Sequence, residues 1–347
     1  MGKRETALVI VLINCIVNAY VLFGQSVKQI TLKPVYQFSG IGAERNSQLY
    51  SPSDFIVTDN NEIVVCDKDD NSIVIFNEYG DFIRRFCSTG QGPSELNHPM
   101  RIGILDNNLA VLDCNNNRVQ ILSIDGKYIQ SYQAPPITSL YLSGSRIVFT
   151  DDGEYYFNPG SYDSESLIIQ KYLDKGLIKG YGKIYGSKKN YLDSGKKLVK
   201  KGKIPDVYKN RVFPVATSEK YVYCIHCSIP VIRMFAPDGK ELWVKHLNLP
   251  ECKLIKKLWI KDNKEAPANV TYRLNYWKDA VVTDDDKLLM LCNIDDRMVM
   301  YEAGMDGTIR KCYLGVNDNI AMIYVKGENL WVFGSDTHKF YRFKLEK

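Results

Sequence analysis

Two stretches of this chain repeat each other and decide its fold. The first is SPSDFIVTDNNEIVVCDKDDNSIVIFNEYGDFIRRF, residues 51–86, and the second is HPMRIGILDNNLAVLDCNNNRVQILSIDGKYIQSY, residues 98–132. Each contains four short apolar runs separated by Asn-, Asp- and Gly-rich turns, and Pro52 and Pro99 are 47 residues apart. A repeat of about 40–50 residues with four strands is typical of a propeller blade.

The same rhythm continues beyond the second repeat. Weaker four-strand units begin near residues 140, 212 and 280, and a last unit from residue 320 has only three strand patterns before the chain ends. The run Val27 to Phe38 has strand character and is positioned to supply the missing strand, which would also protect an open sheet edge. We therefore predict an all-β fold, a six-bladed β-propeller of four-stranded blades over residues 27–347, closed by the N-terminal strand joining the C-terminal blade. Because the pattern of the third unit is weak, five blades and seven blades are the alternatives to six.

The N-terminus has the pattern of an export leader. Lys3 and Arg4 precede an almost wholly apolar run over residues 6–23, which predicts a signal peptide or lipoprotein leader over residues 1–24. Cys15 follows a degraded lipobox in which Asn14 replaces the expected small residue, so lipid anchoring at Cys15 is one alternative. A retained membrane anchor is another, because the run is just long enough to span a bilayer. The predicted location is the periplasm or the outer membrane.

Net charge and cysteine content limit the kinds of partner and of cross-link that the chain could have. The chain of 347 residues has a formal net charge of +5, and removal of residues 1–24 lowers it to about +4, which does not imply a nucleic-acid partner. Most of the eight cysteines after Cys15 lie inside apolar strand patterns, where cysteine is a small buried hydrophobe. We expect most of them to be free thiols. We also expect a monomer that meets a membrane only through its leader or a lipid anchor.

Three short segments resemble the NHL-repeat family. Residues 90–99, GQGPSELNHP, look like the linker that opens such a repeat, and residues 113–120, DCNNNRVQ, look like its Asp-x-x-Asn-x-Arg-hydrophobic-Gln motif. Residues 67–73 are similar, with Ser72 in place of the arginine. Together with the leader, these motifs resemble the exported six-bladed propellers of Bacteroides-type bacteria. The resemblance implies the propeller and says little of function, because propellers host unrelated activities.

Polar residues at the ends of the second strands are the first candidates for ligand contact. Asp67, Asp113, Asn293 and Asp336 hold similar positions in their repeats and are predicted to face one side of the ring. The full candidate binding set is Asp67, Asn71, Asp113, Arg118, Arg101, His98, Asn293 and Asp336. The alternative is that these residues have a structural role, because a short acidic side chain in a tight turn accepts hydrogen bonds from the backbone.

Two basic segments interrupt the blade rhythm, at about residues 183–209 and 250–276. Both are predicted to be insertions between blades, with a helical turn or two, and such excursions often carry binding. Their candidate ligand residues are Lys188, Lys189, Lys196, Lys197, Lys256 and Lys257. Lysines with neighbouring aromatic residues suit an anionic glycan or another polyanion; a solvated loop is the alternative.

No catalytic residue is predicted. Residues 224–227, CIHC, have the spacing of a redox pair or half a metal site, but no second ligand pair follows, and a turn between strands is the favoured interpretation. We therefore predict a non-catalytic binding or protein-interaction propeller at the bacterial cell envelope, with a protein or glycan as its partner. The alternative is a metal-dependent lyase or hydrolase with its site at the central channel, where calcium or another divalent metal would bind.

Overall fold

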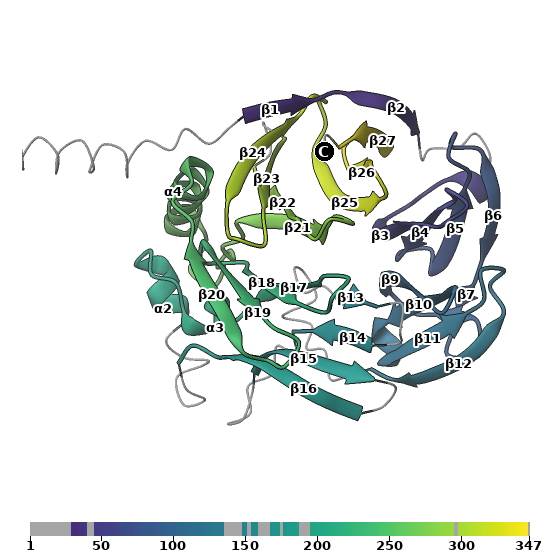
Figure 1. Ribbon diagram of the computed structural model, residues 1–347, viewed down its shortest axis with the longest axis horizontal. Coiled ribbons are helices and arrows are strands. Elements are labelled where there is room, and N and C mark those ends of the chain that lie inside the picture. Colours follow the sequence, from purple (N-terminus) through teal and green to yellow (C-terminus); the bar gives the residue numbers. More distant parts are fainter. Residues whose placement is uncertain are drawn as a thin grey trace, which may run out of the picture.

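The chain forms a ring of six small sheets in the computed structural model (Figure 1). The structure describes residues 29–39, 45–134, 148–150, 154–158, 167–173, 176–186, 195–294 and 298–345. The predicted leader, including Cys15, lies outside the described residues. Within them, none of the helices combines the length and the apolar character needed to cross a bilayer.

The two repeated stretches form the first two blades. Blade 1 contains β3 (Pro52–Val57), β4 (Ile63–Asp67), β5 (Ser72–Phe76) and β6 (Phe82–Phe86). Blade 2 contains β9 (Pro99–Leu105), β10 (Asn108–Asp113), β11 (Arg118–Leu122) and β12 (Tyr128–Gln133). Two short strands, β7 (Ser88–Thr89) and β8 (Glu95–Leu96), pair in the linker between these blades, and the 3-10 turns η1 (Arg45–Ser47) and η2 (Cys114–Asn116) precede β3 and follow β10.

Four further blades complete the ring. Blade 3 contains β13 (Val148–Phe149), β14 (Glu154–Phe157), β15 (Leu167–Leu173) and β16 (Gly176–Lys183). Blade 4 contains β17 (Val212–Ala216), β18 (Val222–His226), β19 (Val231–Phe235) and β20 (Glu241–His246). Blade 5 contains β21 (Trp277–Val282), β22 (Leu288–Cys292), β23 (Val299–Ala303) and β24 (Ile309–Leu314), and blade 6 contains β25 (Ile320–Lys326), β26 (Asn329–Gly334) and β27 (Lys339–Lys344).

The N-terminal segment closes the ring, as predicted. Strand β2 (Pro34–Ser39) pairs antiparallel with β27 and becomes the outer strand of blade 6. The rings of Phe38 and Phe340 stack with centroids 5.1 Å apart across this pairing. The preceding strand β1 (Gln29–Leu32) pairs in parallel with β24 of blade 5, so the segment covers the outer edges of two blades. Exposed edges of both blades are thereby paired.

Six hydrophobic clusters lie between successive blades and form the core. Side chains alternate between the faces of a strand, so Val64 and Cys66 of β4 pack toward blade 2, whereas Ile63 and Val65 pack toward blade 6. Equivalent clusters join the remaining neighbours around the ring. Each blade is stabilised mainly by the two blades beside it, which is the energetic pattern of a repeat protein.

The two basic segments contain the helices. Helices α2 (Gly195–Lys200) and α3 (Asp206–Lys209) precede blade 4, and α4 (Pro250–Glu265) precedes blade 5. The sequence predicted only a helical turn or two, but α4 has 16 residues. It is longer because Cys252, Ile255 and Trp259 recur on one face and are buried in the cluster between blades 4 and 5, and packing of such a stripe is what stabilises a helix of this length.

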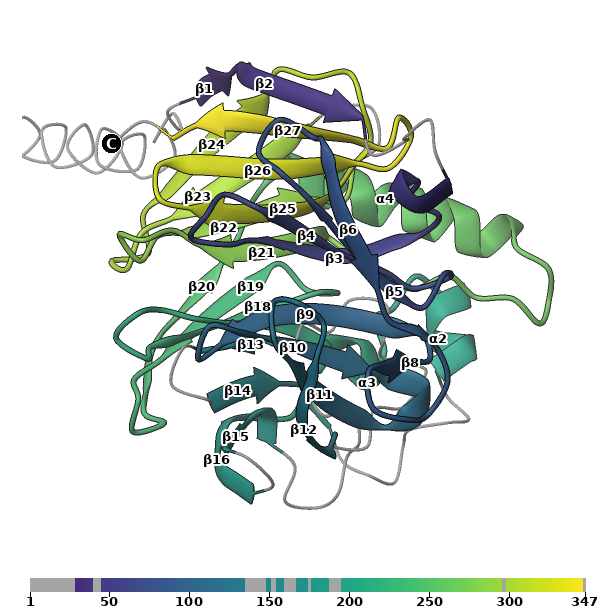
Figure 2. The ribbon, with the colours of Figure 1, turned by 90° about the vertical axis from the view of Figure 1, so that its right-hand side faces the viewer.

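The ring has two distinct rims. Because antiparallel strands alternate in direction, the turns after strands 1 and 3 of each blade lie at one rim, and the turns after strand 2 lie with the blade-to-blade linkers at the other. We call the second the helix rim, because α2, α3 and α4 belong to its linkers, and the first the turn rim. Figure 2 shows the helices gathered at one side of the edge-on ring.

Candidate functional site

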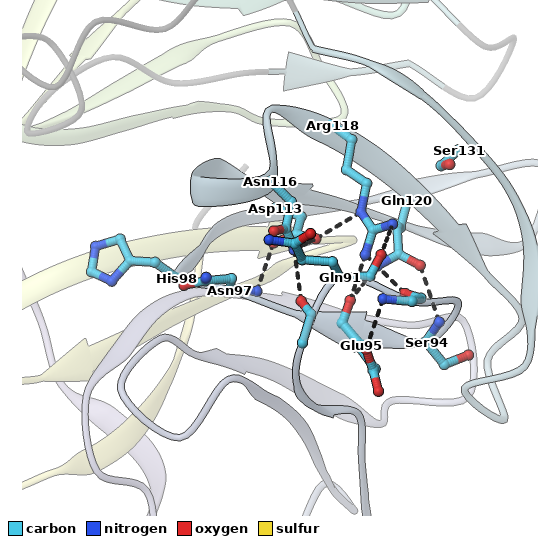
Figure 3. Close-up of polar contacts among 12 residues, drawn as sticks. Gln91, Ser94, Glu95, Asn97, His98, Asp113, Asn116, Arg118, Gln120 and Ser131 are labelled. Carbon is cyan, nitrogen blue, oxygen red and sulfur yellow. Dashed lines mark hydrogen bonds and ion pairs between the residues drawn. The ribbon is translucent and has the colours of Figure 1, made fainter.

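Asp113 is the centre of a buried polar network on the helix rim (Figure 3). Its side chain is 0% exposed at the end of β10. It accepts hydrogen bonds from the backbone N–H of Asn97 at 2.7 Å, from Nδ2 of Asn116 at 2.8 Å and from Nε of Arg118 at 2.8 Å. Three donors of this kind satisfy a buried carboxylate.

Arg118 joins the same network to the linker between blades 1 and 2. Its guanidinium donates to the backbone oxygens of Gln91 at 2.8 Å, Gly92 at 2.9 Å and Glu95 at 2.8 Å. Glu95 in turn accepts the N–H of Gly92 at 2.7 Å. Arg118 therefore uses its donors to hold the linker, and Asp113 and Arg118 act as a linker lock.

Blade 1 contains an equivalent lock built from a different arginine. Asp67, also 0% exposed, accepts the N–H groups of Tyr50 and Ser51, each at 2.7 Å. Burial raises the pKa of Asp67, and these two bonds work against that rise. Where the motif has Ser72 instead of arginine, Arg85 of β6 donates to Ser72 Oγ at 2.6 Å and lies 3.9 Å from the Asp67 carboxylate.

Arg85 also holds the linker that precedes blade 1. Its Nε donates to the backbone oxygen of Asn46 at 3.0 Å, and a second nitrogen donates to the backbone oxygen of Gln48. These contacts match those that Arg118 makes in blade 2. Sequence reasoning missed Arg85, although the departure at Ser72 was a signal to look for a cation on the neighbouring strand.

Asn71, His98 and Arg101 make further contacts between blades 1 and 2. Asn71 accepts the N–H of His98 at 2.6 Å and donates to Thr89 at 2.9 Å. The His98 ring points away from the Asp113 network in Figure 3. Arg101, on inner strand β9, donates to the backbone oxygen of Ser53 on inner strand β3 at 2.9 Å. These three residues link the two blades.

Asn293 and Asp336 lie at the helix rim without forming a shared site. Asn293 donates from Nδ2 to the backbone oxygen of Asn275 at 3.0 Å. Asp336 is exposed, and its N–H donates to Asp318 at 3.3 Å. Asp318, from the linker before β25, is the buried acid of blade 6 and also accepts the hydroxyl of Tyr341 at 2.9 Å. The eight predicted polar residues thus contact their own blades, the linkers or the neighbouring blade, and they do not gather into one site.

The CIHC segment belongs to a strand rather than to a turn. Cys224 and His226 are buried in β18, and Cys227 follows it. His226 takes the place in blade 4 that the acids hold in blades 1 and 2: its Nδ1 lies 2.6 Å from the backbone oxygen of Lys209 in the preceding linker. Burial lowers the pKa of His226 to about 4, so the ring is neutral near pH 7 and its Nδ1–H donates to that oxygen.

The cysteines after Cys15 are free thiols in the structure, as expected. Cys66, Cys87, Cys114, Cys224, Cys227, Cys252, Cys292 and Cys312 form no disulfide. Burial raises the pKa of Cys227 to about 11 and of Cys252 to about 12, which keeps these thiols protonated and unreactive. Within the described part of the chain, no three side chains of His, Cys, Asp and Glu gather closely enough to hold a metal ion.

The lysines of the insertions are the exposed part of the helix rim. Lys196 and Lys197 on α2, and Lys256 and Lys257 on α4, are all exposed; Lys188 and Lys189 lie outside the described residues. Apart from Lys183, which ends β16, the exposed lysines of the described insertions are Lys196, Lys197, Lys201, Lys203, Lys253, Lys256, Lys257, Lys261 and Lys264, and we call this set the lysine surface. The exposed acids of the same segments are Asp206, Asp262 and Glu265, so the surface has a clear positive excess.

Leucines interrupt the charge on α4. Leu254 is 45% exposed and Leu258 is 47% exposed, one helical turn apart among these lysines. Such side chains give a ligand apolar contact next to charge.

These features define the class of the protein: a six-bladed β-propeller with helical insertions on one rim. A family model described as "6-bladed beta-propeller" (DUF5128) matches residues 45–263, more than half of the chain. The chain belongs to this family. A search of curated proteins finds no match.

Solved propellers share the fold at low sequence identity. A DUF4221 family member from Bacteroides vulgatus is 12% identical, with a TM-score of 0.57, covering 91% of this chain and 97% of its own. An exported protein from Bacteroides fragilis is 9% identical, with a TM-score of 0.51 and coverages of 92% and 100%. A virginiamycin B lyase from Staphylococcus aureus is 14% identical, with a TM-score of 0.51 and coverages of 88% and 84%. These likenesses concern the fold alone.

Proposed function

We propose that this protein is a non-catalytic binding propeller of the bacterial cell envelope, and that its lysine surface binds an anionic glycan. The leader predicted over residues 1–24 would deliver the protein to that compartment. The observation that carries the proposal is the positive excess of exposed side chains on α2 and α4, set on a rigidly held pair of helices. The partner is a polysaccharide with carboxylate or phosphate groups, and an acidic protein is the other outcome of the test.

Both ends of α4 are fixed to the body of the propeller. At its N-terminus the buried Glu251 accepts the Tyr301 hydroxyl of blade 5 at 2.5 Å and pairs with Lys311. Toward its C-terminus, Trp259 is buried in the cluster between blades 4 and 5, and its Nε1 donates to the backbone oxygen of Tyr272, in the segment that leads to β21, at 2.7 Å. A helix held in this way presents its lysines without a large ordering cost on binding.

Helix α2 is tied to α4 by a lysine that does not belong to the exposed set. Lys200 donates from Nζ to the backbone oxygens of Asn263 at 2.8 Å and Ala266 at 2.9 Å. These oxygens lie at the C-terminus of α4, where a cation also interacts favourably with the helix dipole. The contact holds α2 against the C-terminal end of α4, and we expect one anionic chain to reach the exposed lysines of both helices.

The distribution of charge explains the choice of ligand. A set of exposed lysines attracts a polyanion through many contacts that are each weak and screened by salt. Leu254 and Leu258 add apolar contact for the sugar rings. A neutral polymer would gain only this second contribution.

The test is a charge reversal on α4. The purified protein is titrated with alginate, an anionic glycan, and with dextran, a neutral one, at low salt. We expect alginate to bind and dextran not to bind. We expect Lys256→Glu/Lys257→Glu to weaken alginate binding at least about tenfold, since two charge contacts change from attractive to repulsive.

The control is Lys240→Glu, an exposed lysine at the turn between β19 and β20 on the turn rim. This variant changes the net charge in the same direction and should leave binding within about twofold, apart from a small long-range effect. Lys240→Glu changes the net charge by two units and the double variant by four. A loss in Lys240→Glu half as large, on a logarithmic scale, as in the double variant would therefore mean that net charge, rather than this surface, governs binding. Preference for poly-glutamate over alginate would favour an acidic protein and overturn the glycan assignment.

A further inference from the structure

A pocket opens on the turn rim, opposite the helices, where the inner strands of blades 6, 1 and 2 end. Its volume is about 430 Å³, within the range of pockets that hold small molecules. The apolar part of its lining comes from Val57 of β3, Ile104 of β9, Tyr324 of β25 and Ile124, which follows β11. None of these residues belongs to the lysine surface, so a ligand of this pocket would be independent of the proposed function.

Unequal turn lengths explain the hollow. In blade 1 the turn between strands 1 and 2 spans residues 58–62, whereas the corresponding turns of the neighbouring blades are only residues 106–107 and 327–328. Asp106 and Asn107 have φ of 47° and 60°, which is the backbone of a tight two-residue hairpin. The longer turn of blade 1 thus stands between two short ones and forms one wall of the pocket.

The apolar lining is held firmly by the core. Tyr324 packs against both clusters that flank blade 1, and its ring centroid is 6.1 Å from that of Phe55. Ile104 and Ile124 pack against the cluster between blades 1 and 2. These side chains are half-buried, so each keeps part of its apolar surface at the pocket with its position fixed by the core.

Two ion pairs lie at the pocket. Lys326 pairs with Asp59, and Arg84 lies 3.7 Å from Glu62 and also donates to the backbone oxygen of Ile124 at 3.2 Å. Each carboxylate of the lining therefore has a cation beside it, and the charges of these four groups cancel.

Two asparagine amides also line the pocket. Asn60 and Asn107 are exposed lining residues from the turns of blades 1 and 2. An amide offers both donors and an acceptor, which suits a ligand whose own groups both donate and accept.

We propose that this pocket binds one ring of a neutral saccharide. Sugar hydroxyls both donate and accept, which matches Asn60, Asn107 and the carboxylates, and hydrogen bonds to charged groups are the stronger kind. The C–H face of the sugar ring would lie on Tyr324 and the two isoleucines. A charged sugar would meet groups already neutralised by their partners. A purely apolar ligand would cover the two asparagine amides without giving them hydrogen bonds, which is costly.

The experiment uses the purified protein and four neutral sugars as probes: glucose, galactose, mannose and N-acetylglucosamine. Saturation-transfer NMR detects contact, and a titration gives Kd. We expect at least one sugar to bind with a Kd of about 1 mM, a value typical of one small ring with few contacts. Asn60→Ala/Asn107→Gly should raise that Kd about tenfold through loss of two hydrogen-bonding amides; glycine keeps the positive φ at position 107.

A second variant blocks the pocket by volume. Ile124→Trp fills the space without removing a polar group, and it should abolish the saturation-transfer signal. Glu328→Ala, an exposed change on the same rim outside the pocket lining, is the matched control and should bind as the parent does. The proposal is wrong if none of the four sugars binds at about 50 mM, far above the expected Kd. It is also wrong if both pocket variants are folded and bind the sugar with the same Kd as the parent protein.

Discussion

The helix rim carries two sets of polar residues that differ in what they contact. The linker locks at Asp67 and Asp113 are buried. Asp67 accepts two backbone N–H groups of the preceding linker, and Asp113 accepts one. The lysine surface on α2 and α4 is exposed. Both sets stood out in the sequence as candidates for ligand contact. The difference teaches that a motif residue at the end of a strand serves the blade, whereas residues inserted between blades are available to a partner.

The locks should matter for stability, and Asp113→Ala is the strongest test. The substitution leaves the largely buried Arg118 without its carboxylate partner, and breaking such a pair costs about 3–5 kcal/mol. Urea unfolding should report a loss of that size. Asp125→Ala, in an exposed turn of the same blade, should lose less than about 0.5 kcal/mol. Equal stability of the two variants would contradict the structural role of the lock.

His226 should make the lock of blade 4 sensitive to pH. Its pKa is about 4 in the folded protein and 6.5 as the ordinary value, so between these two pH values the unfolded chain binds a proton that the folded chain does not. Its contribution is therefore fully present above pH 6.5 and is lost as the pH falls toward 4, by about 3 kcal/mol.

Comparison with His226→Gln isolates this contribution from those of other titrating groups. The free energy of unfolding of the parent, minus that of the variant, should decrease from pH 7 to pH 4. A difference that stays constant over that interval would mean that His226 is not buried in its neutral form.

A substitution of Arg85 tests whether this arginine holds the linker of blade 1 as Arg118 holds the linker of blade 2. Arg85→Ala should cost about 2 kcal/mol, because it removes hydrogen bonds from a partly buried cation to the linker. Residue 72 lies five positions after Asp67, as Arg118 lies five after Asp113. Adding Ser72→Arg to Arg85→Ala should therefore restore about half of the loss in thermal unfolding. If Ser72→Arg restores none of the lost stability, an arginine at position 72 cannot replace Arg85 in holding the linker of blade 1.

The fold was largely predictable because its determinants are local and repeated. Alternating apolar runs and turn residues recur in every blade, and the unpaired last unit required a strand from the N-terminus, which β2 provides. The role of Arg85 was not predictable in this way, since it contacts residues about 40 positions away on a linker. Asp318 was not predictable either, because it acts from the linker before β25, and His226 was not, because a histidine stands at the strand end where blades 1 and 2 have an acid. The length of α4 depends on Trp259 and Ile255 finding a surface between two blades, which no local pattern reveals.

The candidate lysines could be predicted only in part. Exposure of Lys196, Lys197, Lys256 and Lys257 follows from their charge, whereas the junction of α2 with α4 through Lys200 is a tertiary contact. The pocket on the turn rim could not be foreseen, because it arises from differences in turn length between blades that lie side by side only in the closed ring.

The salt dependence of alginate binding tests the central claim most directly. If the lysine surface is the binding site, the affinity of the parent should fall steeply as salt rises, because bound polyanion displaces counterions. The slope of log K against log salt should become shallower in Lys256→Ala/Lys257→Ala and remain that of the parent in Lys240→Ala. A parent slope near zero, or the same slope in all three proteins, would contradict the account.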